Sequence, residues 1–208
     1  MDKLFILSDL DFREILEELS SAGATSVSIL DEDFRIALLK EAEGCHYRPE
    51  DETVGSGDRL VRQEVSSFEN FSAESRYVLL KDSFQELLER SLAKLESCPF
   101  EAALSFNSMV LQRYEEGSIG ITPHRDGSSF INLVCVFVID DRGRFYVCSD
   151  RSGRDARDVD VSPGNVIVMR APRLFSSEDN RPFHYVTDIR EMRYTFGLRQ
   201  KAPWRTSR

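Results

Sequence analysis

Residues 130–139 read FINLVCVFVI, a run dominated by β-branched and aromatic residues, and this composition predicts a β-strand. The next four residues, Asp140-Asp141-Arg142-Gly143, are typical of a hairpin turn in which glycine takes a positive φ. A second strand is predicted immediately afterwards, at residues 144–148. We therefore expect a β-hairpin at the centre of the second half of the chain.

Further short strands are predicted on both sides of this hairpin, at residues 109–111, 159–161, 166–169 and 194–198. Ser162-Pro163-Gly164-Asn165 is a second turn sequence. From Leu104 onward the chain thus has the closely spaced strands of a β-sandwich or barrel.

The first half has helical periodicity instead. Helices are predicted from the Ser8-Asp9-Leu10-Asp11 start to Gly23, from the Asp31 cap to about Gly44, and from Asp82 to Ser97, with a strand at residues 26–30. Residues 47–57 are rich in Pro, Gly and acidic residues and are predicted to form a loop, which we regard as a candidate lid. Helices followed by strands indicate an α+β fold.

The length of 208 residues and the 41% hydrophobic content favour a single domain. We expect residues 1–100 to be mainly helical support and residues 104–200 to be the strand-rich core. The sequence shows neither a bilayer-spanning apolar run nor a secretory signal, so we expect a cytosolic protein without a membrane partner. The four cysteines lack zinc-site spacing and are expected to be buried free thiols.

The net charge of −9 argues against strong nonspecific binding to nucleic acid. Residues 142–208 nevertheless hold 14 Lys and Arg against 8 Asp and Glu. Arginines of this segment either bind carboxylate or phosphate or simply pair with acidic surface residues. Both interpretations apply to the arginine run at residues 142–157, which could rim a pocket or form a solvated face. Trp204 is expected to pack the C-terminal tail, and His46 to be a surface residue.

Two of the three histidines have the pattern of metal ligands. His124 and Asp126 are two positions apart, so on an extended backbone both side chains point to the same face. His184 lies in the later strand region, from which a β-barrel could bring it back to the first pair. Two His and one carboxylate form the facial triad of non-haem iron oxygenases.

A carboxylate-binding pair is predicted close to the third ligand. Arg193 and Thr195 lie two positions apart in a predicted strand and can face the same interior. Arg199 has the same parity and faces inward if the strand stays regular. Because an unpaired buried arginine is costly, we expect an anionic ligand as its counter-charge.

Taken together, Gln112-Arg113-Tyr114-Glu115-Glu116-Gly117, His124-x-Asp126, His184 and the run from Arg193 to Arg199 resemble the AlkB-like branch of the 2-oxoglutarate and iron(II)-dependent dioxygenases. The resemblance implies a double-stranded β-helix, or jelly-roll, core. It also implies that His124, Asp126 and His184 bind iron, that Arg193 and Tyr114 bind the distal carboxylate of 2-oxoglutarate, and that Arg199 supports the end nearer the metal. Dioxygen is then the second co-substrate.

The sequence departs from the family pattern at two places. Gln112 stands where the family usually has Asn, and Gly127-Ser128-Ser129 stands where nucleobase-repairing members carry an acidic residue. The primary substrate therefore stays open among an alkylated nucleobase or nucleotide, a protein side chain and a small metabolite. Hydroxylation and oxidative demethylation both fit. The alternatives are a non-catalytic β-barrel module that binds a metal such as zinc, and an interaction domain in which the histidines are ordinary.

Overall fold

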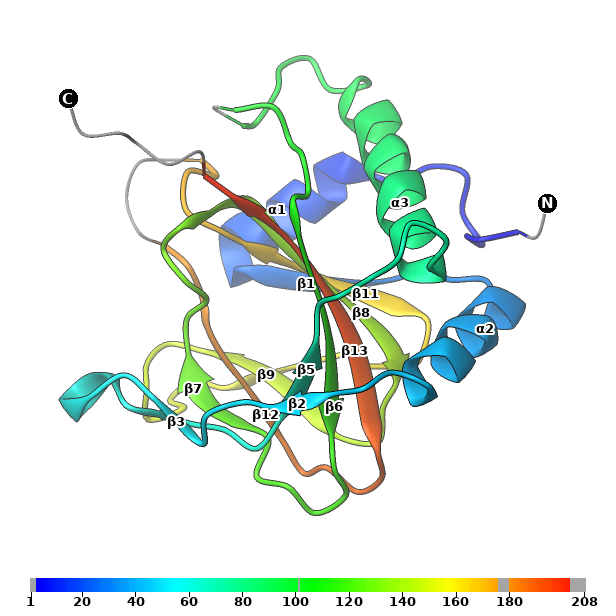
Figure 1. Cartoon of the computed structure of the whole chain (residues 1–208). Coiled ribbons are helices and arrows are strands. Elements are labelled where there is room, and N and C mark those ends of the chain that lie inside the picture. The colour runs from blue at the N-terminus through cyan, green and yellow to red at the C-terminus, as the bar shows by residue number, and fades with distance from the viewer. Residues whose placement is uncertain (1–2, 101, 176–179, 203–208) are drawn as a thin grey trace, which may run out of the picture.

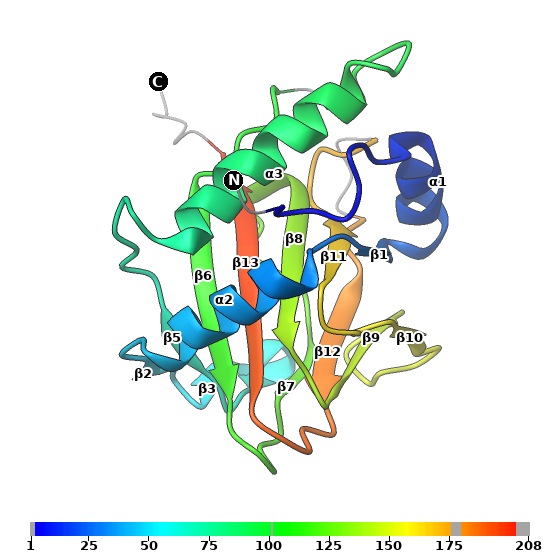
Figure 2. The ribbon, with the colours of Figure 1, turned by 90° about the vertical axis from the view of Figure 1, so that its right-hand side faces the viewer.

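A computed structural model describes residues 3–100, 102–175 and 180–202. Two antiparallel sheets face each other, and helices cover the outer side of the larger one (Figures 1 and 2). The larger sheet contains seven strands, in the order β1 (Ala24–Ser28), β11 (Asn165–Arg170), β8 (Phe130–Asp140), β13 (Arg193–Lys201), β6 (Ser108–Tyr114), β5 (Ser66–Phe68) and β2 (Arg48–Pro49). The smaller sheet contains β10 (Arg157–Val159), β9 (Arg144–Cys148), β12 (Phe183–Thr187) and β7 (Ile121–His124). This is the predicted α+β fold with a jelly-roll core.

The seven-stranded sheet separates two hydrophobic cores. The side chains of its inner strand β8 alternate between the two faces of the sheet and so contribute to both cores. Leu133, Cys135 and Phe137 pack in the core beneath the helices. Val134 and Val136 pack in the core between the two sheets. The interior of the barrel is therefore lined by one face of the larger sheet and one face of the smaller.

The first two helices agree with the predictions. Helix α1 (Phe12–Ala22) is capped by the Asp11 side chain and ends at Gly23, whose φ is 81°. Helix α2 (Glu32–Glu43) is capped by Asp31. The predicted strand at residues 26–30 forms slightly earlier, as β1.

The third helix was predicted too late in the chain. Helix α3 spans Arg76–Leu92, and its first turn begins where the Ser75 hydroxyl accepts a hydrogen bond from the Tyr77 amide at 3.1 Å. Tyr77 and Leu80 extend its buried face toward the N-terminus. In Figure 2, α2 and α3 lie across the same face of the seven-stranded sheet.

The predicted loop at residues 47–57 is in part ordered β-structure. It contains β2 and also β3 (Thr53–Val54), which forms a small hairpin with β4 (Val61–Arg62) across the turn η1 (Gly57–Arg59). The hairpin is anchored beside β7, where the Arg62 amide donates to Thr122 Oγ1 at 2.9 Å.

The turn between β8 and β9 was predicted correctly, but the positive φ expected for its glycine was wrong. Gly143 is not among the residues with positive φ, whereas Gly164 of the second turn has φ 94°. A Cβ at residue 143 would lie 2.8 Å from Ile189 Cδ1 and 3.1 Å from Asp141 Oδ1. Glycine therefore relieves crowding here, although the Ile189 side chain could move to admit a Cβ.

Other predictions on single residues have mixed outcomes. All four cysteines are free, but only Cys135 is buried, whereas Cys98 is exposed. His46 is exposed, as predicted. Trp204 lies outside the described residues. None of the described helices combines the length and the apolar character needed to cross a bilayer.

Candidate metal centre and adjoining cavity

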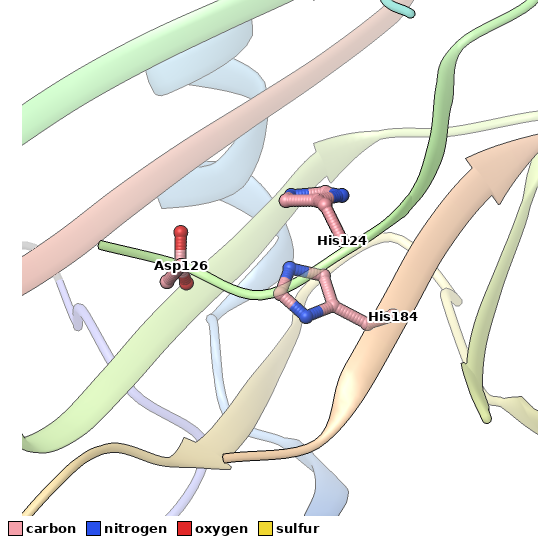
Figure 3. A group of neighbouring side chains, drawn as sticks. All are labelled: His124, Asp126 and His184. Carbon is pink, nitrogen blue, oxygen red and sulfur yellow. The ribbon is translucent and has the colours of Figure 1, made fainter. Parts of the chain in front are cut away.

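The three predicted metal ligands converge between two neighbouring strands. His124 on β7 and His184 on β12 are paired residues in the antiparallel ladder, and their ring centroids lie 4.3 Å apart. Asp126 follows two residues after His124. The ligand atoms of all three side chains lie within 4.8 Å of one another, which fits a mononuclear metal site (Figure 3).

Neither β7 nor β12 was identified as a strand from the sequence. β7 contains Pro123, which normally argues against a strand, but β7 is an edge strand, where a missing N–H is tolerated. β12 follows Pro182, and its register with β7 shifts between His184 and Val186. The signal that could have revealed β12 is its run of aromatic and β-branched residues, FHYVT.

The protonation states at the site are those that metal binding requires. Burial lowers the pKa of His184 to about 3, with a further contribution from His124, and burial also lowers the pKa of His124. Burial by itself raises the pKa of Asp126, but the charges of Arg199 and Arg181, together with electrostatic interactions with the two histidines, outweigh it and keep this pKa below its usual value. At neutral pH the site thus offers two neutral imidazoles and one carboxylate.

A cavity of about 240 Å³ adjoins the triad and lies between the two sheets. The predicted co-substrate residues Gln112, Tyr114, Arg193, Thr195 and Arg199 all line it, together with His124, Asp126 and His184. The structure therefore brings every predicted site residue to one cavity.

Several lining residues were not singled out from the sequence. Apolar walls come from Ile121, Val136, Phe145, Met169 and Val186. Gln63, which follows the β3–β4 hairpin and bridges to Ile121, is the only residue between 47 and 70 that lines the cavity. The predicted lid segment 47–57 does not reach it.

Arg193 lies in a row of three side chains across the larger sheet. On one side, Tyr114 of β6 is its ladder partner, and the guanidinium carbon lies 4.8 Å from the tyrosine ring centroid. On the other side, Arg193 Nε donates a hydrogen bond to Asp141 Oδ2. The Arg193 and Asp141 side chains are 1% and 0% exposed, respectively. Asp141 therefore supplies a counter-charge for Arg193 in addition to the anionic ligand expected from the sequence.

Polar atoms at the cavity wall nevertheless have unused hydrogen-bonding capacity. Arg193 Nη2, Thr195 Oγ1 and Arg199 Nε are buried and have no hydrogen-bond partner among the described residues. Such groups are costly to bury unless a ligand or water satisfies them. Two guanidinium donors and a hydroxyl fit a ligand that is rich in carboxylate oxygens.

Arg199 also contacts the metal-binding carboxylate directly. Its Nη2 lies 3.5 Å from Asp126 Oδ1, and Arg181 Nη1 donates to the backbone oxygen of Asp126. Arg199 therefore points inward, as predicted from its parity with Arg193. Arg199 thus lines the cavity next to Asp126.

The arginine run at residues 142–157 forms mainly a solvated face. Arg142 pairs with Glu191, Arg144 with Asp158 and Asp188, and Arg154 with Asp150 and Asp155. Arg157 donates to the Ala24 backbone oxygen. None of these arginines lines the cavity, although Arg151 lies over the ring of Phe183 beside His184.

Comparison with known proteins gives a likeness of fold. A prolyl hydroxylase from Trichoplax adhaerens, in complex with a hypoxia inducible factor peptide, covers 91% of this chain with 88% of its own, at 12% identity and a TM-score of 0.68. The match to HygX from Streptomyces hygroscopicus, with nickel and 2-oxoglutarate bound, covers 92% of this chain and 87% of the HygX chain, at 11% identity and a TM-score of 0.61. The match to OsALKBH1 covers 86% of this chain and 98% of the OsALKBH1 chain, at 16% identity and a TM-score of 0.58.

These structures include oxygenases of different branches, so the likeness does not single out the AlkB-like one. No family model matches the chain, and no curated protein matches it in sequence. The likeness to these solved structures therefore shows a shared jelly-roll fold.

Proposed function

We propose that this chain is an oxidoreductase, an iron(II)- and 2-oxoglutarate-dependent dioxygenase. The observation that carries the proposal is the His124, Asp126 and His184 triad beside a cavity whose wall presents buried donors that have no partner in the described part of the chain. In this assignment the triad holds iron(II), Arg193 and Tyr114 bind the distal carboxylate of 2-oxoglutarate, and Arg199 supports its inner end. Thr195 and Gln112 complete the polar lining.

When bound, iron(II) and 2-oxoglutarate supply the oxidising chemistry, in which dioxygen is consumed, 2-oxoglutarate becomes succinate and carbon dioxide, and a substrate C–H bond is hydroxylated. The chain's own residues provide position and environment. The neutral imidazoles of His124 and His184 and the ionised Asp126 would hold the metal. Val136, Met169 and Val186 form an apolar part of the cavity wall, which limits access of water on that side.

The partnerless donors favour this proposal over a non-catalytic zinc module. A module that only binds metal needs the triad but no polar wall around an adjoining cavity. Here three buried polar atoms on β13 lack a partner among the described residues, and a dicarboxylate would satisfy them.

The substrate follows less directly from the site. An alkylated nucleobase or nucleotide comes from the AlkB-like resemblance, and OsALKBH1 is among the similar structures. A protein side chain or a small metabolite is the alternative, and the similar structures include a prolyl hydroxylase and HygX. The net charge of −9 and the exposed Gly127-Ser128-Ser129 turn, which offers no carboxylate, favour the alternative.

The test uses the purified protein under anaerobic conditions. Addition of iron(II) and then 2-oxoglutarate should produce a weak visible charge-transfer band. Oxygen should then drive succinate formation that increases with methylated oligonucleotides, peptide pools or metabolite pools, whichever contains the substrate. A wild-type protein that binds iron(II) but gives no band and no succinate with any pool would favour the non-catalytic module.

A further inference from the structure

Asp141 occupies its place opposite Arg193 because of an irregularity in β8. Tyr194 pairs with Asp140, whereas the next ladder pair is Thr195 with Val138, so β8 contains one extra residue at this point. Beyond the bulge, the antiparallel register brings Asp141 next to Arg193. Without the extra residue, the alternation of side chains would place Asp140 there instead.

The turn that follows β8 fixes the second carboxylate oxygen of Asp141. The Gly143 amide donates to Asp141 Oδ1 at 2.5 Å, while Oδ2 accepts from Arg193 Nε. Asp141 thus lies behind the guanidinium and does not line the cavity. Arg193 Nη2 has no hydrogen-bond partner within residues 3–100, 102–175 and 180–202, and Arg193 does line the cavity.

This arrangement neutralises the charge of Arg193 at the cavity wall. An isolated buried guanidinium would be strongly destabilising, and a fully buried carboxylate beside it offsets that cost. The same carboxylate remains behind Arg193 when an anion binds in front. Two anions that share one guanidinium repel each other, so each weakens the other's binding.

We propose that Asp141 is a positioning residue that directs Arg193 into the cavity and lowers the affinity of the cavity for the distal carboxylate of the co-substrate. This inference rests on the proposed function. Asp141 keeps the guanidinium buried and aimed before 2-oxoglutarate arrives. It also prevents the dicarboxylate from binding so tightly that succinate, which carries the same distal carboxylate, would leave slowly.

The test compares two ligands that differ only at the distal end. 2-Oxoglutarate and 2-oxopentanoate share the 2-oxo acid group and the five-carbon chain, but only the former has the distal carboxylate. Binding of each to the cobalt(II)-loaded protein is measured by calorimetry. The amide oxygen of Asp141→Asn can still accept from Arg193 Nε and keep the guanidinium aimed, while the negative charge is lost. For this variant we expect 2-oxoglutarate to bind roughly threefold to tenfold more tightly than to wild type, and 2-oxopentanoate to bind unchanged.

The neighbouring aspartate provides a matched control. Asp140→Asn removes the same charge one residue earlier, and Asp140 neither contacts Arg193 nor lines the cavity. Its affinities for both ligands should equal those of wild type. A folded Asp141→Asn protein that binds 2-oxoglutarate with unchanged or weaker affinity would overturn the inference, because a merely structural role predicts one of those results.

Wild-type behaviour separates this inference from the proposed function. If wild type binds neither ligand, the proposed function fails. If wild type prefers 2-oxoglutarate and Asp141→Asn does not strengthen that preference, only the role of Asp141 fails.

Should Asp141→Asn not fold, the pairing is tested by urea unfolding of Arg193→Met and of the double variant Arg193→Met/Asp141→Leu. The double variant should be the more stable of the two, and lower stability would overturn the pairing.

Discussion

His124 and His184 are ladder partners on adjacent antiparallel strands, although 59 residues of chain separate them. Cross-strand partners have their side chains close together on the same face of a sheet. The backbone pairing of β7 with β12 therefore places both imidazoles correctly before any metal binds. Asp126 completes the triad just beyond the end of β7, where the chain is no longer held by the ladder.

Replacement of one ladder histidine should abolish metal binding. For His124→Ala we expect the affinity for iron(II) or cobalt(II), measured anaerobically by calorimetry, to fall about a hundredfold or more, because only two protein ligands remain. His46→Ala is the control, since His46 is exposed and remote from the cavity. Equal metal affinity in His124→Ala and His46→Ala would refute the assignment of the triad.

Removal of Arg193 should weaken binding of the co-substrate and spare the metal. Because Arg193→Ala alone leaves Asp141 buried without its partner, the cleaner variant is Arg193→Met/Asp141→Leu. We expect its affinity for 2-oxoglutarate to fall roughly tenfold to a hundredfold, with metal affinity nearly unchanged. Arg190→Ala, which removes a surface arginine paired with Asp188, should leave both affinities as in wild type. Parallel loss of metal and 2-oxoglutarate affinity would contradict the role of Arg193.

The site shows which features a sequence can reveal. The order and spacing of His124, Asp126, His184 and Arg193 can be read directly from the sequence. They were sufficient to predict residues that line one cavity. The partner of Arg193 was not predictable in this way. A single bulge in β8 decides whether Asp140 or Asp141 faces the arginine, and local hydrophobic patterning does not encode the register of distant strands.

The fold shows the same division. The core strand β8 and the capped helices α1 and α2 have strong local signals and were predicted closely. Strand β7 was missed because Pro123 is tolerated only by virtue of its edge position, which is a property of the sheet. The start of helix α3 was predicted too late in the chain. Its cap, Ser75, also donates a hydrogen bond to Glu41 of α2, a residue 34 positions earlier, and local sequence does not show this contact.

Acid should destabilise the metal-free protein through His184. Its pKa of about 3 in the folded state lies below the ordinary value of 6.5, so between these values the unfolded chain binds a proton that the folded chain excludes. Stability should therefore fall as the pH decreases from about 6.5. In urea unfolding at pH 6.5 and 4.5, His184→Gln should lose roughly 2 kcal/mol less than wild type over this interval. An identical slope in both proteins would show that His184 is not buried in its neutral form.

Alanine substitution of two glycines before β7 separates the effect of a steric clash from the effect of backbone strain. Gly120 and Gly117 have φ values of 74° and 76°, so alanine is strained at either position. A Cβ at residue 120 would also lie 2.2 Å from the Val186 backbone oxygen on β12, whereas a Cβ at residue 117 would have no heavy atom within 4 Å. We expect Gly117→Ala to cost about 1 kcal/mol of unfolding free energy and Gly120→Ala about 3 kcal/mol or more.

The additional loss in Gly120→Ala should be accompanied by weaker metal binding, because the clash separates β7 from β12 and thereby His124 from His184. Gly117→Ala should keep the metal affinity of wild type. Calorimetric titration of cobalt(II) into both variants, below their melting temperatures, provides the measurement. If Gly120→Ala were destabilised but bound metal normally, the pairing of the two strands would not be what holds the histidines together.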